Sequence, residues 1–205
     1  MAGLFITLEG GDGSGKSTQS ALLAQWLRSA GRTVVLSREP GGSDLGLELR
    51  HIILHRRGYI APRAEALIYA ADRAHNIATV VRPALESGAV VIQDRYIDSS
   101  VAYQGAGRVL DPAEVRSLSE WATENLWPDL TILLDLAVDV GRARLDAADK
   151  EFDRLEAEQA EFHTRVREAF LQIAASDQER VMRVDASLPV EEIAHRIRSR
   201  VESLL

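Results

Sequence analysis

Residues 4–18 read LFITLEGGDGSGKST: an apolar run, a glycine-rich turn, and a lysine followed by two hydroxyl residues. The part from Gly10 to Ser17 fits G-x-x-x-x-G-K-[ST], a pattern whose backbone N–H groups surround a phosphate at the start of a helix. The apolar run at 4–9 predicts a strand before the motif, and the apolar spacing in 18–31 predicts a helix after it. Pattern and context together predict a binding site for a nucleoside triphosphate.

Within this site we expect Lys16 to reach the β- and γ-phosphates of ATP and the Ser17 hydroxyl to ligate Mg²⁺. A chance match to a glycine-rich turn is the alternative, and the strand–loop–helix context argues against it. The residues expected to contact ATP are Gly10, Gly11, Asp12, Gly13, Ser14, Gly15, Lys16, Ser17 and Thr18.

Apolar, β-branched segments alternate with helical patterns along the rest of the chain. Residues 98–108 are predicted to form a loop or to begin a helix. Continuous apolar strands between helices are typical of a parallel sheet covered on both faces. We therefore predict an α/β fold with the three layers of a phosphate-loop NTPase, a five-stranded parallel sheet and one domain over 1–205. Further strands are expected at 33–39, 89–95, 130–136 and 180–186, and helical segments at about 45–86, 112–126, 139–175 and 190–204.

Composition restricts the class of protein. The 205 residues include no cysteine, which excludes disulfides, thiolate metal sites and a thiol nucleophile, and fits a reducing cytoplasm. The formal net charge of −7 argues against a nucleic-acid partner. No apolar run has the roughly 18 residues of a membrane span, and the N-terminus does not resemble a secretory signal. No Asn-Lys-x-Asp segment, the guanine-reading motif of GTPases, occurs.

Two further clusters follow strands, at the edge where open α/β sheets bind ligands. They are Arg38-Glu39-Pro40-Gly41-Gly42 and Asp94-Arg95-Tyr96, the latter running into SSVAYQG at 99–105. Taken in order with the phosphate loop, ADRA (71–74) and PDLTILLDL (128–136), they resemble the bacterial thymidylate kinases of the nucleoside monophosphate kinase superfamily. This resemblance implies in-line transfer of a phosphoryl group from ATP to dTMP with Mg²⁺, and a homodimer.

The resemblance also implies roles on the acceptor side. Tyr69 would stack on thymine and Arg73 would hydrogen-bond the base. Arg95 would hold the phosphate of dTMP as a planar, bidentate donor, with Arg38 and Arg50 as further candidates. The alternatives are a buried core position for Tyr69 and a local ion pair with Asp72 for Arg73.

Five more positions acquire expected roles from the resemblance. Ser100 and Gln104 would lie near the edge of the base, and Tyr103 against the sugar. Asp12 would face the sugar 3′-hydroxyl and the metal region. Asp94 would lie near Mg²⁺, although a plain strand end is the alternative for Asp94-Arg95.

A segment dense in both charges, at about 142–156, corresponds to the lid that closes over ATP in this family. Family members take a transition-state cation either from the phosphate loop or from the lid, and loop positions 11–14 carry no basic residue. The candidates are therefore Arg142, Arg144, Lys150 and Arg154, of which Arg154 in DRLE (153–156) is favoured. A solvated charged helix is the alternative. The expected catalytic residues are Lys16, Asp12, Arg95 and Arg154.

Two other classes of function remain open from the sequence. One is a related enzyme, either a deoxynucleoside kinase that uses Asp94-Arg95 near a sugar 5′-hydroxyl or a kinase for another monophosphate. The other is an ATP-dependent switch, which would bind nucleotide without turnover. Apolar helix faces at 66–81 and 115–127 could form the dimer contact.

Overall fold

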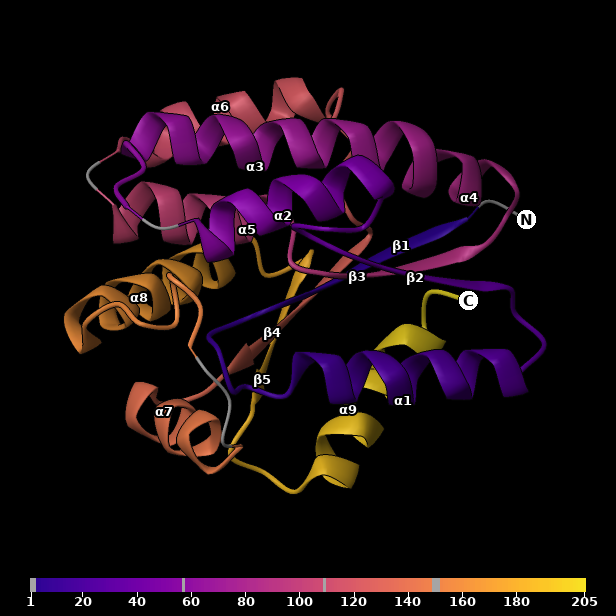
Figure 1. The fold of residues 1–205 in the computed structure, drawn as a ribbon. Helices are drawn as coiled ribbons and strands as arrows, with labels where there is room; N and C mark the ends of the chain where they lie inside the picture. Colours follow the sequence, from indigo (N-terminus) through magenta and orange to yellow (C-terminus); the bar gives the residue numbers. More distant parts are fainter. Residues whose placement is uncertain (1–2, 57, 109, 149–151) are drawn as a thin grey trace.

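A computed structural model describes residues 3–56, 58–108, 110–148 and 152–205 (Figure 1). These residues form a five-stranded, fully parallel sheet in the order β2-β3-β1-β4-β5. The predicted α/β fold is confirmed. The strands are β1 (Leu4–Glu9), β2 (Val34–Arg38), β3 (Val90–Asp94), β4 (Leu130–Asp135) and β5 (Val181–Asp185).

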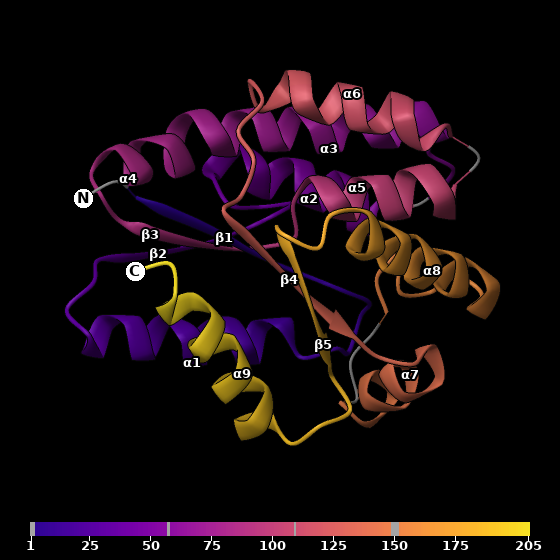
Figure 2. The ribbon, with the colours of Figure 1, turned by 180° about the vertical axis from the view of Figure 1, so that it is seen from behind.

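Helices α1 (Lys16–Ser29) and α9 (Val190–Glu202) cover one face of the sheet (Figures 1 and 2). Their apolar residues, such as Leu23 and Ile197, pack with alternate residues of the strands, including Ile6 and Ile92. Because side chains alternate along a strand, the remaining strand residues face the second helical layer. This first layer fixes α1, and with it the phosphate loop, at the carboxyl end of β1.

The second layer covers the other face and holds the acceptor-side clusters (Figures 1 and 2). Phe5 and Val91 of the sheet pack here with Tyr69, Tyr96 and Phe170. The elements of this layer are α2 (Asp44–His55), α3 (Pro62–Asn76), η1 (Ile77–Val81), α4 (Arg82–Glu86), α5 (Ile97–Ser100), η2 (Val101–Gly107), α6 (Pro112–Ala122) and α8 (Ala160–Ser176). Helix α7 (Val138–Ala147) contacts α8 and lies towards the side of α1 and α9 (Figures 1 and 2).

The structure decides between the two predicted states of 98–108. These residues are helical, as α5 followed by the wider π-helical turns of η2. Small residues permit close packing there: a Cβ atom on Gly105 would lie 3.0 Å from Pro112 Cα, and one on Gly107 would lie 2.7 Å from the Phe162 ring. The same small residues weaken the helical pattern in the sequence.

The charged stretch 139–175 also differs from a single helical region. It contains α7 and α8, with turns between residues 152 and 159 where the structure describes the chain. None of the described helices combines the length and apolar character that crossing a bilayer requires.

Strand register brings the functional clusters together. Asp94 at the end of β3 pairs with Leu8 of β1 on one side and with Arg38 of β2 on the other. The phosphate loop and both predicted acceptor clusters therefore leave the sheet at neighbouring points of one edge.

Candidate active site

The phosphate loop is a tight turn between β1 and α1. Gly10, Gly13 and Gly15 have φ values of 135°, 74° and 91°, a region that favours glycine. At Gly13 a Cβ atom would also lie 2.5 Å from the Gly141 carbonyl oxygen on α7. Helix α1 begins at Lys16 and has no acidic residue in its first turn. The loop thus opens at a helix N-terminus suited to an anion.

Lys16 lies folded over this loop. Its Nζ donates to the carbonyl oxygens of Gly10 at 3.1 Å and Gly11 at 2.8 Å. Burial and the positive charge of Arg95 lower the pKa of Lys16. A cation that has already lost most of its hydration is well placed to exchange carbonyl oxygens for phosphate oxygens.

Ser17 and Asp94, the predicted metal residues, are in contact. Ser17 Oγ donates to Asp94 Oδ2 at 3.2 Å, and Asp94 Oδ1 is buried with no hydrogen-bond partner among the described residues. An unsatisfied buried carboxylate oxygen beside a hydroxyl is a donor set that fits Mg²⁺ or a water bound to it. Among the described residues, no group of three or more His, Cys, Asp or Glu side chains could hold a metal ion. A Mg²⁺ ion commonly keeps several waters and binds substrate phosphates beside one or two carboxylates.

Arg95 connects the phosphate loop with the second layer. It has a φ of 69°, a left-handed conformation that is uncommon for a residue with a side chain and is concentrated at functional sites. Its Nη1 donates to Gly10 O at 3.1 Å and Ser99 Oγ at 3.2 Å, and its Nη2 donates to Asp12 and to Tyr103 Oη at 3.2 Å. Among the described residues, none accepts a hydrogen bond from Nε.

Asp12 completes this contact from the loop. Although burial opposes ionisation, the charges of Arg95 and Lys16 hold the pKa of Asp12 below its ordinary value. Tyr103 Oη also donates to Asp12 Oδ2 at 3.1 Å. The carboxylate therefore fixes both a cation and a phenol at the boundary of the phosphate loop.

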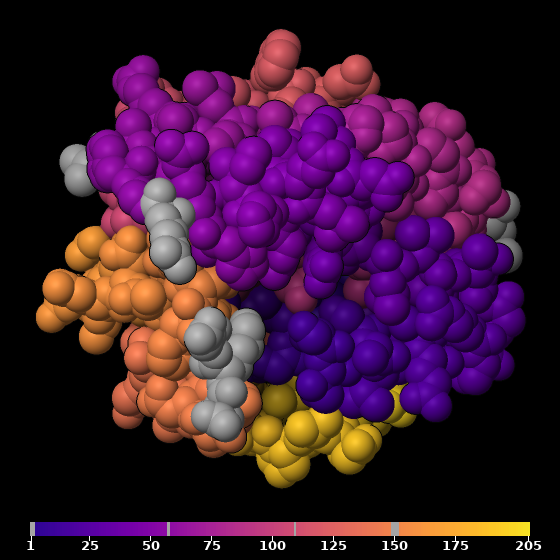
Figure 3. All heavy atoms as spheres, viewed as in Figure 1, coloured from indigo at the N-terminus to yellow at the C-terminus, as the bar shows by residue number. Residues whose placement is uncertain are grey.

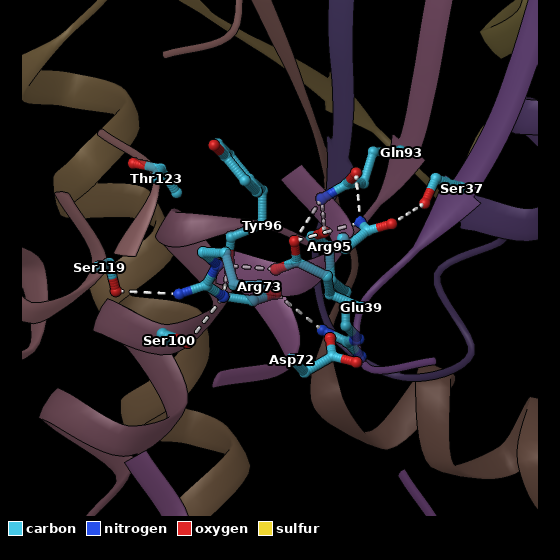
Figure 4. A network of polar contacts seen from close by, with 12 residues as sticks. Ser37, Glu39, Asp72, Arg73, Gln93, Arg95, Tyr96, Ser100, Ser119 and Thr123 are labelled. Atoms are coloured by element: carbon cyan, nitrogen blue, oxygen red, sulfur yellow. Dashed lines mark hydrogen bonds and ion pairs between the residues drawn. The ribbon is translucent and has the colours of Figure 1, made fainter. Parts of the chain in front are cut away.

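Arg73 is the centre of a buried polar network (Figure 4). The side chain is 1% exposed and pairs with Glu39, Nε to Oε2, at 2.7 Å. Its Nη1 donates to Ser119 Oγ at 2.9 Å, and its Nη2 donates to Tyr96 O and Ser100 Oγ, both at 3.0 Å. These four bonds leave one N–H of Nη1 for a ligand. The local ion pair with Asp72 considered from the sequence is replaced by this longer-range pair with Glu39.

Glu39 is buried despite its charge. The Glu39–Pro40 peptide is cis, and Gln93 Nε2 donates to Glu39 Oε1 at 2.8 Å. Burial raises the pKa of Glu39 from 4.5 to about 7, although the charge of Arg73 acts in the opposite direction. Ionising this carboxyl group in the folded protein therefore costs free energy.

The stability of a Glu39→Gln variant should depend on pH. Because the folded-state pKa is raised, the contribution of Glu39 is fully present below 4.5 and is lost as the pH rises through about 7. Glutamine cannot ionise, so this pH-dependent contribution is absent from the variant, although its amide has one acceptor fewer for Arg73 and Gln93. In urea unfolding, the free energy of unfolding of the wild type should therefore fall by about 2–3 kcal/mol relative to that of the variant between pH 5 and pH 8. A relative loss of stability in the variant at pH 8 would show instead that the ion pair with Arg73 outweighs burial.

A cavity of about 630 Å³ joins the two halves of the site. In Figure 3 the surface is hollowed between the violet helical layer above and the indigo N-terminal segment below. Tyr69 is both core and cavity lining, so the two alternatives for it are not exclusive. The predicted residues on the cavity wall are Asp12, Gly13, Gly15, Lys16, Ser17, Thr18, Arg38, Arg50, Tyr69, Arg73, Asp94, Arg95, Ser100, Tyr103 and Gln104.

Three predicted residues of the phosphate loop, Gly10, Gly11 and Ser14, do not line this cavity. Gly10 and Gly11 contribute carbonyl oxygens to Lys16, and Ser14 Oγ is buried without a partner among the described residues. On the acceptor side Arg38 is exposed, while the Arg50 guanidinium donates to Pro40 O at 2.8 Å. Burial and the charge of Arg38 lower the pKa of Arg50.

The cavity brings the phosphate loop together with the ring of Tyr69 and the guanidinium groups of Arg73 and Arg95. The thymidylate kinase family model matches residues 8–197. The chain belongs to the thymidylate kinase family. The thymidylate kinase of Leifsonia xyli subsp. xyli is 70% identical over 200 residues, covering 98% of this chain and 95% of that one. That of Clavibacter sepedonicus is 68% identical over 205 residues, covering 100% and 97%.

A solved structure extends the likeness to the whole fold. The crystal structure of thymidylate kinase from Ehrlichia chaffeensis superposes with a TM-score of 0.80 at 30% identity, covering 98% of this chain and 99% of that one. The resemblance inferred from the sequence motifs is therefore confirmed at the level of family and fold.

In this thymidylate kinase family member, Arg154 was the favoured candidate for the transition-state cation of the lid. Arg154 Nε donates to Ile53 O at 2.8 Å, and its Nη2 pairs with Glu65 Oε2 at 2.5 Å. Arg154 is therefore directed towards α2 and α3, and it is not among the described residues that line the cavity. Its catalytic assignment stays a prediction.

The other lid candidates differ in placement. Arg144 Nη1 donates to Gly13 O at 3.3 Å, which sets this guanidinium against the phosphate loop. Arg142 stacks 3.8 Å from the centre of the Phe152 ring. Lys150 lies outside the described residues.

Two buried carboxyl groups beside the site of this thymidylate kinase family member, Glu9 and Glu65, were not predicted from the sequence. Both are 0% exposed, and Glu39, predicted only as part of the cluster after β2, is 3% exposed. Burial and the charge of Asp98 raise the pKa of Glu9 to about 7. The burial of Glu9 could have been predicted from the sequence. Glu9 ends an apolar strand directly before the phosphate loop, and strands of a parallel sheet are covered on both faces.

Proposed function

We propose that the protein transfers the γ-phosphoryl group of ATP to the phosphate of dTMP, forming dTDP. The observation that carries this proposal is the single cavity whose wall includes both Lys16 of the phosphate loop and the acceptor-side residues Tyr69, Arg73 and Arg95. Family membership supports the choice of dTMP as acceptor.

The acceptor oxygen is already anionic, so a strong general base is unnecessary, and positioning and charge neutralisation provide the catalysis. Lys16 would contact the phosphates of ATP. Arg95 would contact the phosphate of dTMP through Nε, while Asp12 and Tyr103 hold its Nη2 group. One guanidinium thus orients the acceptor from the edge of the donor site, as in-line transfer requires.

Ser17 and Asp94 are proposed to hold Mg²⁺, directly or through water. The metal would neutralise negative charge on the β- and γ-phosphate oxygens. The orphaned Oδ1 atom of Asp94 supports this assignment.

On the base side, Tyr69 supplies the aromatic face and Arg73 the remaining N–H of Nη1. Arg73 is held by four hydrogen bonds, which keep that donor in place without ligand. We propose that it donates to O4 of thymine. Ser100 and Gln104 line the same wall near the base edge, and Tyr103 would limit space at the sugar.

The segment at about 142–156 is proposed to close over ATP and exclude water, which would otherwise hydrolyse it. Arg144 already contacts the phosphate loop. Arg154 would have to exchange Glu65 for phosphate in order to act there.

The transfer of label from γ-³²P-ATP tests this function against the two alternatives. Incubation with Mg²⁺ and either dTMP or thymidine should give labelled dTDP from dTMP and no labelled dTMP from thymidine. Label in dTMP would indicate a nucleoside kinase. Binding of ATP with no labelled nucleotide product would indicate a switch.

We further propose a homodimer in the cytoplasm, where the nucleotide substrates are present. Helices α3 and α6 lie side by side on the outer side of their layer (Figures 1 and 2). Leu67 on α3 is 57% exposed and Trp121 on α6 is 79% exposed. Tryptophan is enriched at the centre of interfaces, and Leu67 adds apolar area beside it.

A Leu67→Glu/Trp121→Glu variant is expected to sediment as a monomer at concentrations where the wild type is a dimer, because two charges would be buried at the interface. Sedimentation velocity measures this, with Leu205→Glu as a control at another exposed apolar residue. A wild type that sediments as a monomer would contradict the proposed dimer.

A further inference from the structure

Glu65, described so far only as the partner of Arg154, is fully buried in the first turn of α3. Its Oε1 accepts a hydrogen bond from Gln104 Nε2 at 3.0 Å. Its Oε2 pairs with Arg154 Nη2 at 2.5 Å and with Arg108 Nη2 at 3.4 Å. The carboxylate therefore joins a cavity-lining amide to two arginines that compensate its charge.

The chemistry of this contact fixes the orientation of Gln104. A carboxylate can only accept hydrogen bonds, whereas an amide side chain has one donor end and one acceptor end. Gln104 must therefore turn Nε2 towards Glu65. Its acceptor, Oε1, is left for the cavity that it lines together with Tyr69 and Arg73, and none of the described residues donates to it.

An acceptor at this position distinguishes pyrimidine bases. Thymine carries a hydrogen on N3 and an acceptor at O4, whereas cytosine has a lone pair on N3 and an amino donor on C4. Gln104 Oε1 matches the N3–H of thymine and would face the lone pair of cytosine. The free N–H of Arg73 matches O4 in the same way and opposes the amino group. A mispaired buried polar group is a strong source of discrimination.

We propose that Glu65 is the positioning residue that sets base specificity, by holding the Gln104 amide with Oε1 rather than Nε2 towards the base. The preference for thymine over cytosine then depends on a residue behind the wall of the cavity. This inference rests on the proposed function for the identity of the acceptor.

Glu65→Gln tests the proposal. The glutamine introduced at this position can donate as well as accept, so Gln104 becomes free to reverse and to offer Nε2 to cytosine N3. Titration calorimetry measures the dissociation constants of dCMP and dTMP. The dissociation constant of dCMP divided by that of dTMP should fall by about tenfold or more, which corresponds to the free energy of one buried hydrogen bond. The ratio of kcat/KM values should fall in parallel.

A double variant provides the rescue. In Glu65→Gln/Gln104→Glu the new carboxylate on η2 can only accept, and the new amide on α3 can donate to it, so an acceptor again faces the base. The double variant keeps the total charge of the cluster, which favours folding, and should recover most of the wild-type ratio. Circular dichroism verifies the fold of each variant.

Arg108→Met is the matched control, because it removes a partner of Glu65 but not the Glu65–Gln104 bond. It should lower Tm and leave the dCMP:dTMP ratio unchanged. The proposal is overturned if Glu65→Gln weakens both nucleotides equally, or if the double variant does not recover the ratio. If the proposed function itself is wrong, the wild type would bind dTMP without releasing ADP from ATP. That result differs from both of the outcomes that overturn the role of Glu65.

Discussion

Replacing Lys16 with alanine is expected to lower kcat by about 10³-fold or more while leaving the protein folded. Lys16 Nζ contacts the carbonyl oxygens of Gly10 and Gly11 and forms no ion pair among the described residues. Its loss removes one of the two positive charges near Asp12, and the ion pair of Asp12 with Arg95 is kept. Alanine also suits the first position of α1. Steady-state ADP release with ATP, Mg²⁺ and dTMP measures the effect, and thermal unfolding checks the fold.

Lys16→Met is the matched control, because methionine keeps most of the side-chain length and removes the charge. It should be as slow as Lys16→Ala, since charge rather than packing is what Lys16 provides. Retention of more than about a tenth of wild-type kcat in either variant would contradict the role of Lys16 in phosphoryl transfer.

Replacing Arg95 with lysine is expected to lower kcat/KM for dTMP by roughly 10²-fold, even though the charge is kept. Four of the five N–H donors of Arg95 bind Gly10, Ser99, Asp12 and Tyr103, and Nε is left for the acceptor. One ammonium group cannot reach the same partners in that geometry. The KM for ATP should change much less, because Lys16 and the phosphate-loop N–H groups, rather than Arg95, would contact the phosphates of ATP.

Arg63→Lys is a control for the same substitution in an exposed ion pair, with Glu114. Exposed pairs of this kind contribute little, so stability and kinetics should both stay close to wild type. If Arg95→Lys changes the KM for ATP as much as that for dTMP, Arg95 would belong to the donor site instead.

The local parts of this structure could be predicted from the sequence because short patterns determine them. A glycine-rich loop between an apolar strand and a helix specifies its own geometry, and Asp94-Arg95 follows an apolar strand that must end at the ligand edge. The order of such segments also led to the correct family. The prediction of one α/β layered domain follows from the same alternation.

The parts that could not be predicted depend on contacts between distant residues. Glu39 meets Arg73 across 34 positions and Glu65 meets Arg154 across 89, and no local pattern encodes either pair. The helical state of η2 depends on packing against α6 and α8, because its glycines argue locally for a loop. Arg154 was predicted to be the lid cation because it lies in the DRLE motif. Its pairing with Glu65 could not be predicted, because the two residues meet only in the folded chain.

The most direct test of the central claim is ADP release from ATP and Mg²⁺ against dTMP, dUMP, dCMP, dGMP, AMP and thymidine in parallel. One cavity joining Lys16 to Tyr69, Arg73 and Arg95 predicts fast turnover with dTMP, slower turnover with dUMP and none with thymidine. Equal turnover with purine and pyrimidine monophosphates, or none with dTMP from folded protein that binds ATP, would contradict it.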